Sequence, residues 1–95
     1  MIVEYLRYTI DAERQAAFIE AYKKAEPILL SSPYALAFEL CQCVEDPSQF
    51  IIRIEWTSAE DHLQKFRGSQ VFRDFFGCVR PFLGDIAEMR HYSAL

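Results

Sequence analysis

The sequence predicts a single α+β domain over residues 1–95, in which strands and helices follow the order β-α-β-β-α-β. Three observations predict this fold. The chain is 95 residues long, which suits one hydrophobic core and is too short for two. Four segments alternate apolar and polar residues as strands do, and the two regions between them repeat apolar residues as helices do. Residues typical of turns separate most of these segments.

The first strand and the first helix are predicted from residues 2–10 and from the segment after them. One face of this strand carries Ile2, Glu4, Leu6, Tyr8 and Ile10. Asp11 is a suitable N-cap for the helix, whose apolar face holds Phe18, Tyr22, Ala25 and Leu29. Pro27 is expected to end or kink the helix near Glu26, because proline has no N–H to donate.

Residues 34–44 and 49–56 are predicted to form a hairpin. Both segments alternate, and residues 45–48 between them have the composition of a turn. The apolar faces are expected to consist of Tyr34, Leu36, Phe38 and Leu40 on one strand and of Phe50, Ile52, Ile54 and Trp56 on the other.

Two helices and a fourth strand are predicted in the rest of the chain. Thr57 and Ser58 each precede an acidic residue by three positions, which is the pattern of a capping box. Gly68 is expected to end the first helix as a C′ residue, and Ser69 to cap the second. The apolar face of the second helix is expected to hold Phe72, Phe75, Phe76 and Val79. Pro81 and Gly84 interrupt it, and residues 86–92 alternate as a last strand.

This order is the ferredoxin-like arrangement, an antiparallel four-stranded sheet with the helices on one face. The helices are expected to cover the face with Leu6, Phe38 and Ile52. The other face, expected to be uncovered, holds Val3, Tyr5, Ala37, Cys41, Cys43 and Ile51. Because 52% of the residues are hydrophobic, this face exposes more apolar surface than a soluble monomer usually tolerates. We therefore expect a homodimer whose two sheets pack together.

Composition disfavours several classes of function. The formal net charge of −4 argues against nucleic-acid binding, and no stretch reaches the ~20 apolar residues of a membrane span. Without an export signal, the three cysteines are expected in a reducing compartment, by default the cytoplasm. Cys41, Cys43 and the histidines lack the spacing of a structural zinc site, so no metal is expected.

Two parts of the sequence carry a family resemblance. The segment Glu45-Asp46-Pro47 … Phe50, continued by Ile54 to Glu60 and by Ser69 … Phe72, resembles the small antibiotic biosynthesis monooxygenases of the dimeric α/β-barrel superfamily. This resemblance implies oxidation of an electron-rich phenol or quinol by O2 without flavin, metal or any other cofactor. The haem-degrading branch is disfavoured, because Leu6, Phe66 and Phe76 stand where those members have Asn, Trp and His.

The implied reaction needs an apolar cavity, a proton acceptor and a donor for an oxyanion. His91, on a strand face with Ala87 and Met89, is the first candidate for the acceptor, and His62 is the second. The alternative for His91 is a core histidine satisfied by a hydrogen bond, and the alternative for His62 is a side chain that points into solvent. Trp56 is expected to pack in the core and to form one cavity wall. The expected substrate-binding residues are Leu6, Tyr8, Phe38, Ile52, Trp56, Phe66, Phe72 and Phe76.

Three functional hypotheses follow. The first is a cofactor-independent monooxygenase acting on a small phenol or quinol. The second is a non-catalytic dimeric module that binds a small apolar, aromatic molecule, and the third is an isomerase or lyase on the same barrel. A base and an acid that reach one cavity favour the enzymes, whereas a filled core favours the binding module.

Overall fold

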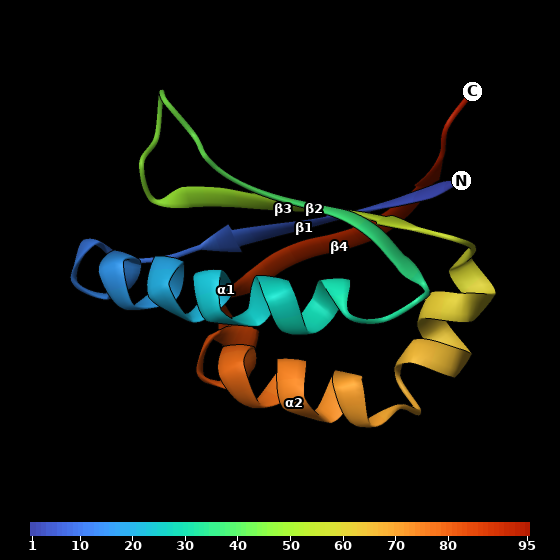
Figure 1. Cartoon of the computed structure of the whole chain (residues 1–95). Helices are drawn as coiled ribbons and strands as arrows, with labels where there is room; N and C mark the ends of the chain where they lie inside the picture. Colours follow the sequence, from blue (N-terminus) through green and yellow to red (C-terminus); the bar gives the residue numbers. More distant parts are fainter.

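The computed structural model describes residues 1–95 and shows the predicted α+β, ferredoxin-like architecture (Figure 1). Four antiparallel strands form one layer in the order β2-β3-β1-β4, and both helices lie against one of its faces. The elements are β1 (Ile2–Thr9), η1 (Ala12–Arg14), α1 (Gln15–Leu30), β2 (Ala35–Gln42), β3 (Gln49–Trp56), η2 (Asp61–Phe66), α2 (Gln70–Val79), η3 (Arg80–Asp85) and β4 (Ile86–Ser93).

The hydrophobic core lies between the sheet and α1. All four residues predicted for the apolar face of α1 are buried, and β1 contributes Leu6 and Tyr8, with Ile10 buried directly after the strand. The aromatic rings of the core pack edge to face or tilted; the centroids of Phe18 and Phe50, for example, are 4.9 Å apart. The side of the sheet that faces the helices is therefore the one predicted from alternation.

Of two local predictions about helix ends, one is wrong and one is confirmed. Pro27 does not end α1, which continues to Leu30, because the burial of Leu29 and the capping bonds of Ser31 offset the one N–H that proline lacks. The prediction that the helix stops at Gly68 is confirmed: η2 ends at Phe66 with Arg67 as its C-cap, so Gly68 is the C′ residue, although its φ is not positive. Its lack of a side chain matters for another reason: a Cβ there would lie 3.2 Å from the carbonyl oxygen of Gln64.

Of the caps predicted in the second helical region, those of Ser58 and Ser69 are present, whereas the Thr57 hydroxyl donates to the Asp61 carboxylate instead of capping at Glu60. Ser58 Oγ accepts a 2.9 Å hydrogen bond from the backbone N–H of Asp61, and Ser69 Oγ accepts one of 3.2 Å from Phe72. The segment between them, η2, winds as a π-helix rather than an α-helix. This wider turn places His62 and Phe66 on its buried side.

Two predictions about β2 are also wrong. A register shift between Ala35 and Ala37 turns Leu36 away from the core face. Leu36 is therefore 54% exposed instead of buried. The strand ends at Gln42, so Cys43 does not lie on the sheet. Its Sγ instead accepts a hydrogen bond from the backbone N–H of Asp46 in the turn.

The sheet face away from the helices is covered by no part of the chain (Figure 1). It presents Tyr5 and Ile51, which are 38% and 40% exposed, and Tyr92, whose ring packs edge to face against Tyr5. Ion pairs such as Arg53–Glu55, at 3.1 Å, interrupt this apolar surface. No helix of the chain is both long and apolar enough to span a membrane.

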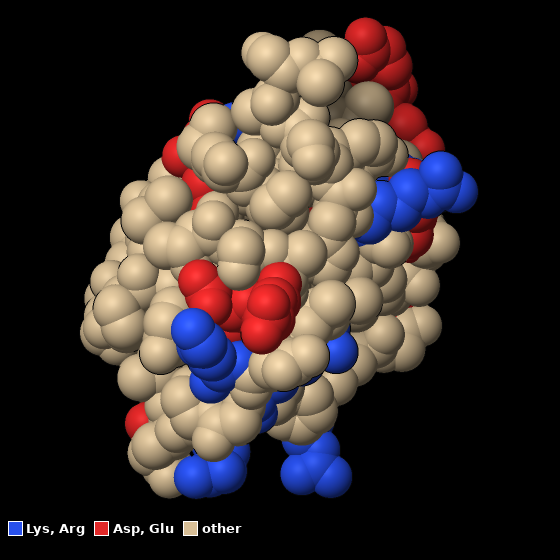
Figure 2. Space-filling view, turned by 90° about the vertical axis from the view of Figure 1, so that its right-hand side faces the viewer, with Lys and Arg blue, Asp and Glu red and all other residues tan.

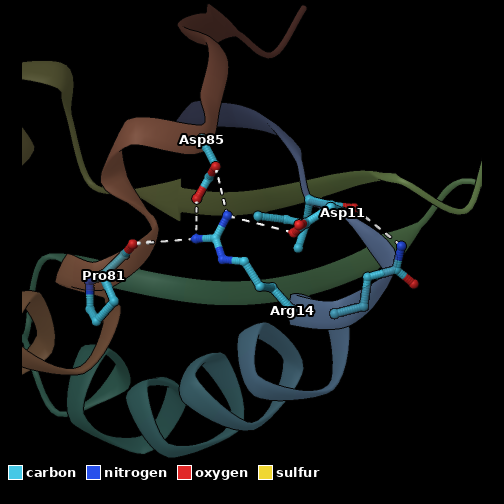
Figure 3. A network of polar contacts seen from close by, with 6 residues as sticks. Asp11, Arg14, Pro81 and Asp85 are labelled. Carbon is cyan, nitrogen blue, oxygen red and sulfur yellow. Dashed lines mark hydrogen bonds and ion pairs between the residues drawn. The ribbon is translucent and has the colours of Figure 1, made fainter.

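An ion pair ties the two ends of the helical layer together. Figure 3 shows Arg14 of η1 bonded to both carboxylate oxygens of Asp85, at 3.0 and 2.6 Å, and approaching the carbonyl of Pro81. The same guanidinium lies 5.3 Å from the ring centroid of Phe82. This network fixes η3 and thus the start of β4, whose far end carries His91.

Candidate active site

A cavity of about 310 Å³ lies between the sheet and the second helical region. Its wall runs along β1 from Glu4 to Tyr8 and is closed by side chains of α2, η3 and β4. Twelve of its 15 lining residues are hydrophobic, and the other three are Glu4, His62 and Arg67. An apolar cavity with a few polar groups at defined places is the usual form of a small-molecule site.

The cavity contains some of the residues predicted to bind substrate and not others. Those that line it are Leu6, Tyr8, Trp56, Phe72 and Phe76. Ile52 and Phe66 are buried in the core instead, and Phe38 stacks on Tyr22 with ring centroids 6.1 Å apart. Of the two predicted proton acceptors, His62 lines the cavity and His91 does not.

Glu4 is the one carboxyl group in the cavity wall. Alternation along β1 turns it inward with Leu6 and Tyr8, and its side chain is 3% exposed. The indole N–H of Trp56 donates a 3.0 Å hydrogen bond to Glu4 Oε1. Burial raises the pKa of Glu4 to about 7, although the Trp56 bond and the nearby Arg67 charge oppose the shift. The group therefore changes its protonation state near neutral pH.

His62 is held beside Glu4 by its packing on Trp56. The two rings stack with centroids 4.2 Å apart and an angle of 12° between their planes. His62 Nε2 lies 3.7 Å from Glu4 Oε1, and its Nδ1 lies 2.7 Å from Nε2 of His91. Each nitrogen of the His62 ring thus faces a different titratable partner.

His91 reaches this position because β4 pairs with β1. Its backbone lies directly opposite Glu4 in the antiparallel register, on the same side of the sheet. The side chain is half-buried, whereas His62 is buried. The predicted strand face with Met89 and His91 is therefore the face toward the helices.

Both imidazoles are neutral at pH 7. Burial lowers the pKa of His62 to about 3, and the positive charges of Arg67 and of a protonated His91 act in the same direction. Burial and Arg67 also lower the pKa of His91. Glu4 and His62 consequently do not form a charged ion pair, in agreement with the 3.7 Å between their atoms.

Arg67 brings a positive charge to the cavity wall. It follows η2 directly, is exposed, and no carboxylate lies within 4.0 Å of its guanidinium. Figure 2 shows this end of the molecule, where η2 and both chain termini lie; most of the surface is uncharged, and Lys and Arg side chains project at its lower edge. An unpaired guanidinium beside an apolar cavity suits an anionic oxygen.

Glu4, His62 and His91 offer one carboxylate and two imidazoles whose ligand atoms lie within 4.8 Å of one another. This is a donor set that transition metals accept. The geometry here is that of a chain, because His62 faces Glu4 with one nitrogen and His91 with the other. An ion could bind all three side chains only by replacing the hydrogen bond between the histidines. Cys41 and Cys43 lie outside this cluster.

Sequence reasoning named both histidines as candidates and did not name Glu4 or Arg67, which the structure places in the cavity wall. The signal for Glu4 was present, since it is the only charged residue on the otherwise apolar face of residues 2–10. Arg67 carried no such signal, because its place at the cavity depends on the π-helical turn before it.

Comparison with known proteins adds the family. The model of the family "Antibiotic biosynthesis monooxygenase" matches residues 1–77. The chain belongs to this family. It is 24% identical over 93 residues to the uncharacterized protein YczJ of Bacillus subtilis, a match that covers 98% of each chain.

Solved structures of the family have the same fold. A candidate antibiotic biosynthesis monooxygenase from Bordetella bronchiseptica superimposes with a TM-score of 0.82 at 21% identity, covering 99% of this chain and 96% of that one. SnoaB of Streptomyces nogalater, a cofactor-independent oxygenase, gives a TM-score of 0.78 at 14% identity, with 99% and 92% covered. At these identities the likeness shows the fold.

Proposed function

We propose that this protein is a cofactor-independent monooxygenase that oxidises a small phenol or quinol with O2. The observation that carries the proposal is a carboxyl group with a pKa of about 7 in the wall of an apolar cavity. A general base works best when its pKa lies near the working pH, and Glu4 meets this condition. The family and the cofactor-independent activity of SnoaB support the same reaction.

Each part of the cavity has a role in this reaction. The aromatic substrate packs among Phe72, Phe76 and Trp56, and the Glu4 carboxylate removes its phenolic proton. Arg67 stabilises the phenolate, which gives an electron to O2. Recombination and loss of water yield a quinone, so the balanced reaction is RH2 + O2 → RO + H2O. The substrate loses two hydrogen atoms and gains one oxygen atom, a four-electron oxidation, and O2 accepts these four electrons as one of its atoms leaves in water and the other stays in the product.

Glu4 replaces His91 as the proposed acceptor for two reasons. His91 does not line the cavity, and the one histidine that does, His62, has a pKa too low to hold a proton at neutral pH. The predicted histidines keep a place beside the carboxyl group, His62 in the cavity wall and His91 behind it.

The test is the oxidation of anthrone in air by purified protein freed of metal and flavin. The rate must exceed that of spontaneous oxidation measured without protein. We expect Glu4→Gln to lower kcat by ~10²–10⁴-fold with little change in KM, because a base acts mainly in the transition state. The matched control is Leu63→Ala, which changes an exposed residue of η2 and should leave kcat unchanged. A Glu4→Gln variant with full activity would exclude Glu4 as the base.

A ligand-binding module is the alternative that this assay separates from an enzyme. If neither anthrone nor a series of quinols reacts faster than its spontaneous oxidation, while the same compounds bind with a 1:1 stoichiometry, the chain acts as a binding module. The apolar lining of the cavity supports binding in either case.

We also propose that the protein is a homodimer through its uncovered sheet face, and that it acts in the cytoplasm. The exposed Tyr5, Ile51 and Tyr92 support this interface, and three free cysteines suit a reducing compartment. Light scattering is expected to give about twice the 11.1 kDa mass of the chain. Cys41, which lies exposed on this face of the single chain, should react slowly with a thiol reagent in the dimer. A folded monomer with a rapidly labelled Cys41 would contradict this assembly.

A further inference from the structure

The two histidines and Glu4 form a continuous line of proton-carrying groups. Glu4 and His62 both line the cavity, with 3.7 Å between Glu4 Oε1 and His62 Nε2, and His91, outside the cavity, lies 2.7 Å from the other ring nitrogen of His62. Burial decreases along this line, since Glu4 and His62 are buried and His91 is half-buried on β4. Because β4 is an edge strand, the line leads from the cavity to the border of the sheet.

We propose that His62 and His91 relay the substrate proton from Glu4 to solvent at the edge strand β4. This inference rests on the proposed transfer of a proton from substrate to Glu4. His91 then acts as the outlet of a relay and His62 as its central member, and neither needs to touch the substrate.

The ring positions define the transfer. His62 carries its proton on Nδ1 and donates it to Nε2 of His91. This leaves His62 Nε2 free to accept from the Glu4 carboxyl when the two side chains move from 3.7 Å to hydrogen-bond distance. The Glu4 O–H bond breaks as the His62 Nε2–H bond forms, and the His62 Nδ1–H bond breaks as the His91 Nε2–H bond forms. His91 releases its Nδ1 proton to water. No electron moves, and one proton enters and leaves each ring.

Such a concerted transfer explains why a histidine with a low pKa occupies the middle of the line. The buried His62 does not hold a second proton, because burial and the charge of Arg67 disfavour its imidazolium form. A proton that enters at Nε2 while another leaves at Nδ1 never creates that form. The stacking of His62 on Trp56 keeps the ring in the one orientation that faces both partners.

The line also runs in reverse. The reaction RH2 + O2 → RO + H2O releases no net proton, so the peroxide intermediate must recover one before water is lost. Return of a proton through His91 and His62 supplies it and restores the starting tautomers of both rings. During the interval the phenolate is separated from its proton, which leaves it free to react with O2.

The first experiment measures anthrone oxidation by His91→Ala in buffers with and without imidazole. We expect His91→Ala to lower the rate of anthrone oxidation by at least about tenfold. This loss should be smaller than the ~10²–10⁴-fold loss expected when a base in contact with the substrate is removed. Added imidazole should restore the rate of His91→Ala in a saturable way and should not restore Glu4→Gln. Ser93→Ala, on the same strand and exposed, is the control. Unchanged activity of His91→Ala, or a loss that imidazole does not reverse, would overturn the relay.

The second experiment needs no substrate and so separates the relay from the proposed reaction. The chain has two histidines, so ¹⁵N-histidine labelling gives a spectrum that the His62→Ala and His91→Ala variants assign completely. We expect a scalar coupling between His62 Nδ1 and His91 Nε2 across the hydrogen bond, and loss of the Nδ1–H tautomer of His62 in His91→Ala. If the rings show no coupling, the relay is overturned, whether or not anthrone is oxidised. If the coupling is present but no substrate reacts, the oxidation proposal fails and the relay stands.

Discussion

The two ends of the β1–β4 strand pair hold polar clusters built in opposite ways. At the end where β4 begins, Arg14 and Asp85 are ionised, partly exposed and joined by two short hydrogen bonds. At the end where β4 finishes, Glu4, His62 and His91 are buried or half-buried and are not joined by an ion pair of opposite charges at pH 7. The first cluster keeps its charges in solvent, whereas the second holds titratable groups where their charged forms are disfavoured.

This difference shows how burial changes the use of the same chemistry. The Arg14 guanidinium lowers the pKa of Asp85, so this carboxylate stays charged and acts as a tether. Glu4 has no guanidinium bonded to it, and burial raises its pKa to about 7. A carboxyl group that exchanges its proton near neutral pH is suited to catalysis, and one that stays ionised is suited to holding two segments together.

The largest expected effect comes from the residue that supports the buried cluster. Trp56 is 1% exposed, stacks on His62 and donates to Glu4. We expect Trp56→Ala to lower the free energy of unfolding by ~3–5 kcal/mol, the usual cost of deleting a buried aromatic side chain. Urea denaturation measures this loss. Trp56→Phe, which keeps most of the packing and removes only the N–H, should lose clearly less; equal losses for the two would show that the hydrogen bond to Glu4 dominates.

The next effect is a pH dependence of stability that Glu4, unlike Asp85, should produce near neutral pH. The pKa of Glu4 is about 7 in the folded chain against 4.5 for an unperturbed group. Between these values the folded state binds a proton that the unfolded state lacks, so stability falls as pH rises, by up to about 3 kcal/mol. The side chain in Glu4→Gln stays neutral at every pH. The free energy of unfolding of this variant should therefore rise relative to that of the wild type as the pH goes from about 5 to about 8.

Urea denaturation of both proteins at these two pH values tests the prediction. The titratable groups facing or near Glu4 are His62, His91, Arg67, Tyr8 and Tyr22. His62 has the opposite dependence, since its lowered pKa makes stability rise with pH from about 3 toward 6.5. Both proteins contain it, so their difference isolates Glu4. A difference that is the same at both pH values would contradict the raised pKa.

A buried pair of hydroxyl groups should give a smaller effect. Tyr8 and Tyr22 are hydrogen-bonded to each other, and both are 0–1% exposed. Tyr22→Phe leaves the Tyr8 hydroxyl buried without this partner, and we expect it to cost about 1–3 kcal/mol. The double variant Tyr8→Phe/Tyr22→Phe removes both groups and should recover much of that loss. Urea denaturation of the three proteins measures the recovery, and a double variant less stable than Tyr22→Phe alone would refute it.

The sequence predicted the layers of this fold well because alternation and helical spacing report which side chains face the core. The four buried residues of α1 and the inward face of β3 follow from spacing alone. The continuation of α1 through Pro27 and the exposure of Leu36 did not follow from local pattern. Tertiary packing overrode the preference of Pro27, and a register shift overrode that of Leu36. Such effects depend on neighbours that are distant in sequence.

The site was predictable only in part for the same reason. His62 and His91 are 29 residues apart, and their contact requires both the pairing of β4 with β1 and the π-helical winding of η2. Glu4 was visible as a lone charge on an apolar strand face, but its role depends on the N–H of Trp56 and on the cavity that α2 leaves open. Titratable residues that break an apolar pattern are therefore the part of such a site that sequence reasoning can find.

The smallest effect is expected at the exposed cluster. Asp85→Asn removes the charge that pairs with Arg14 but leaves an amide that can still accept from the guanidinium. Because Arg14 is 40% exposed, solvent and salt already screen the pair, and the fall in melting temperature should be slight and should shrink further as salt is added. The rate of anthrone oxidation should not change, since Asp85 does not line the cavity. If Asp85→Asn instead slows oxidation as strongly as Glu4→Gln, the position of β4 depends on this tether, and the two clusters are coupled through the strand that joins them.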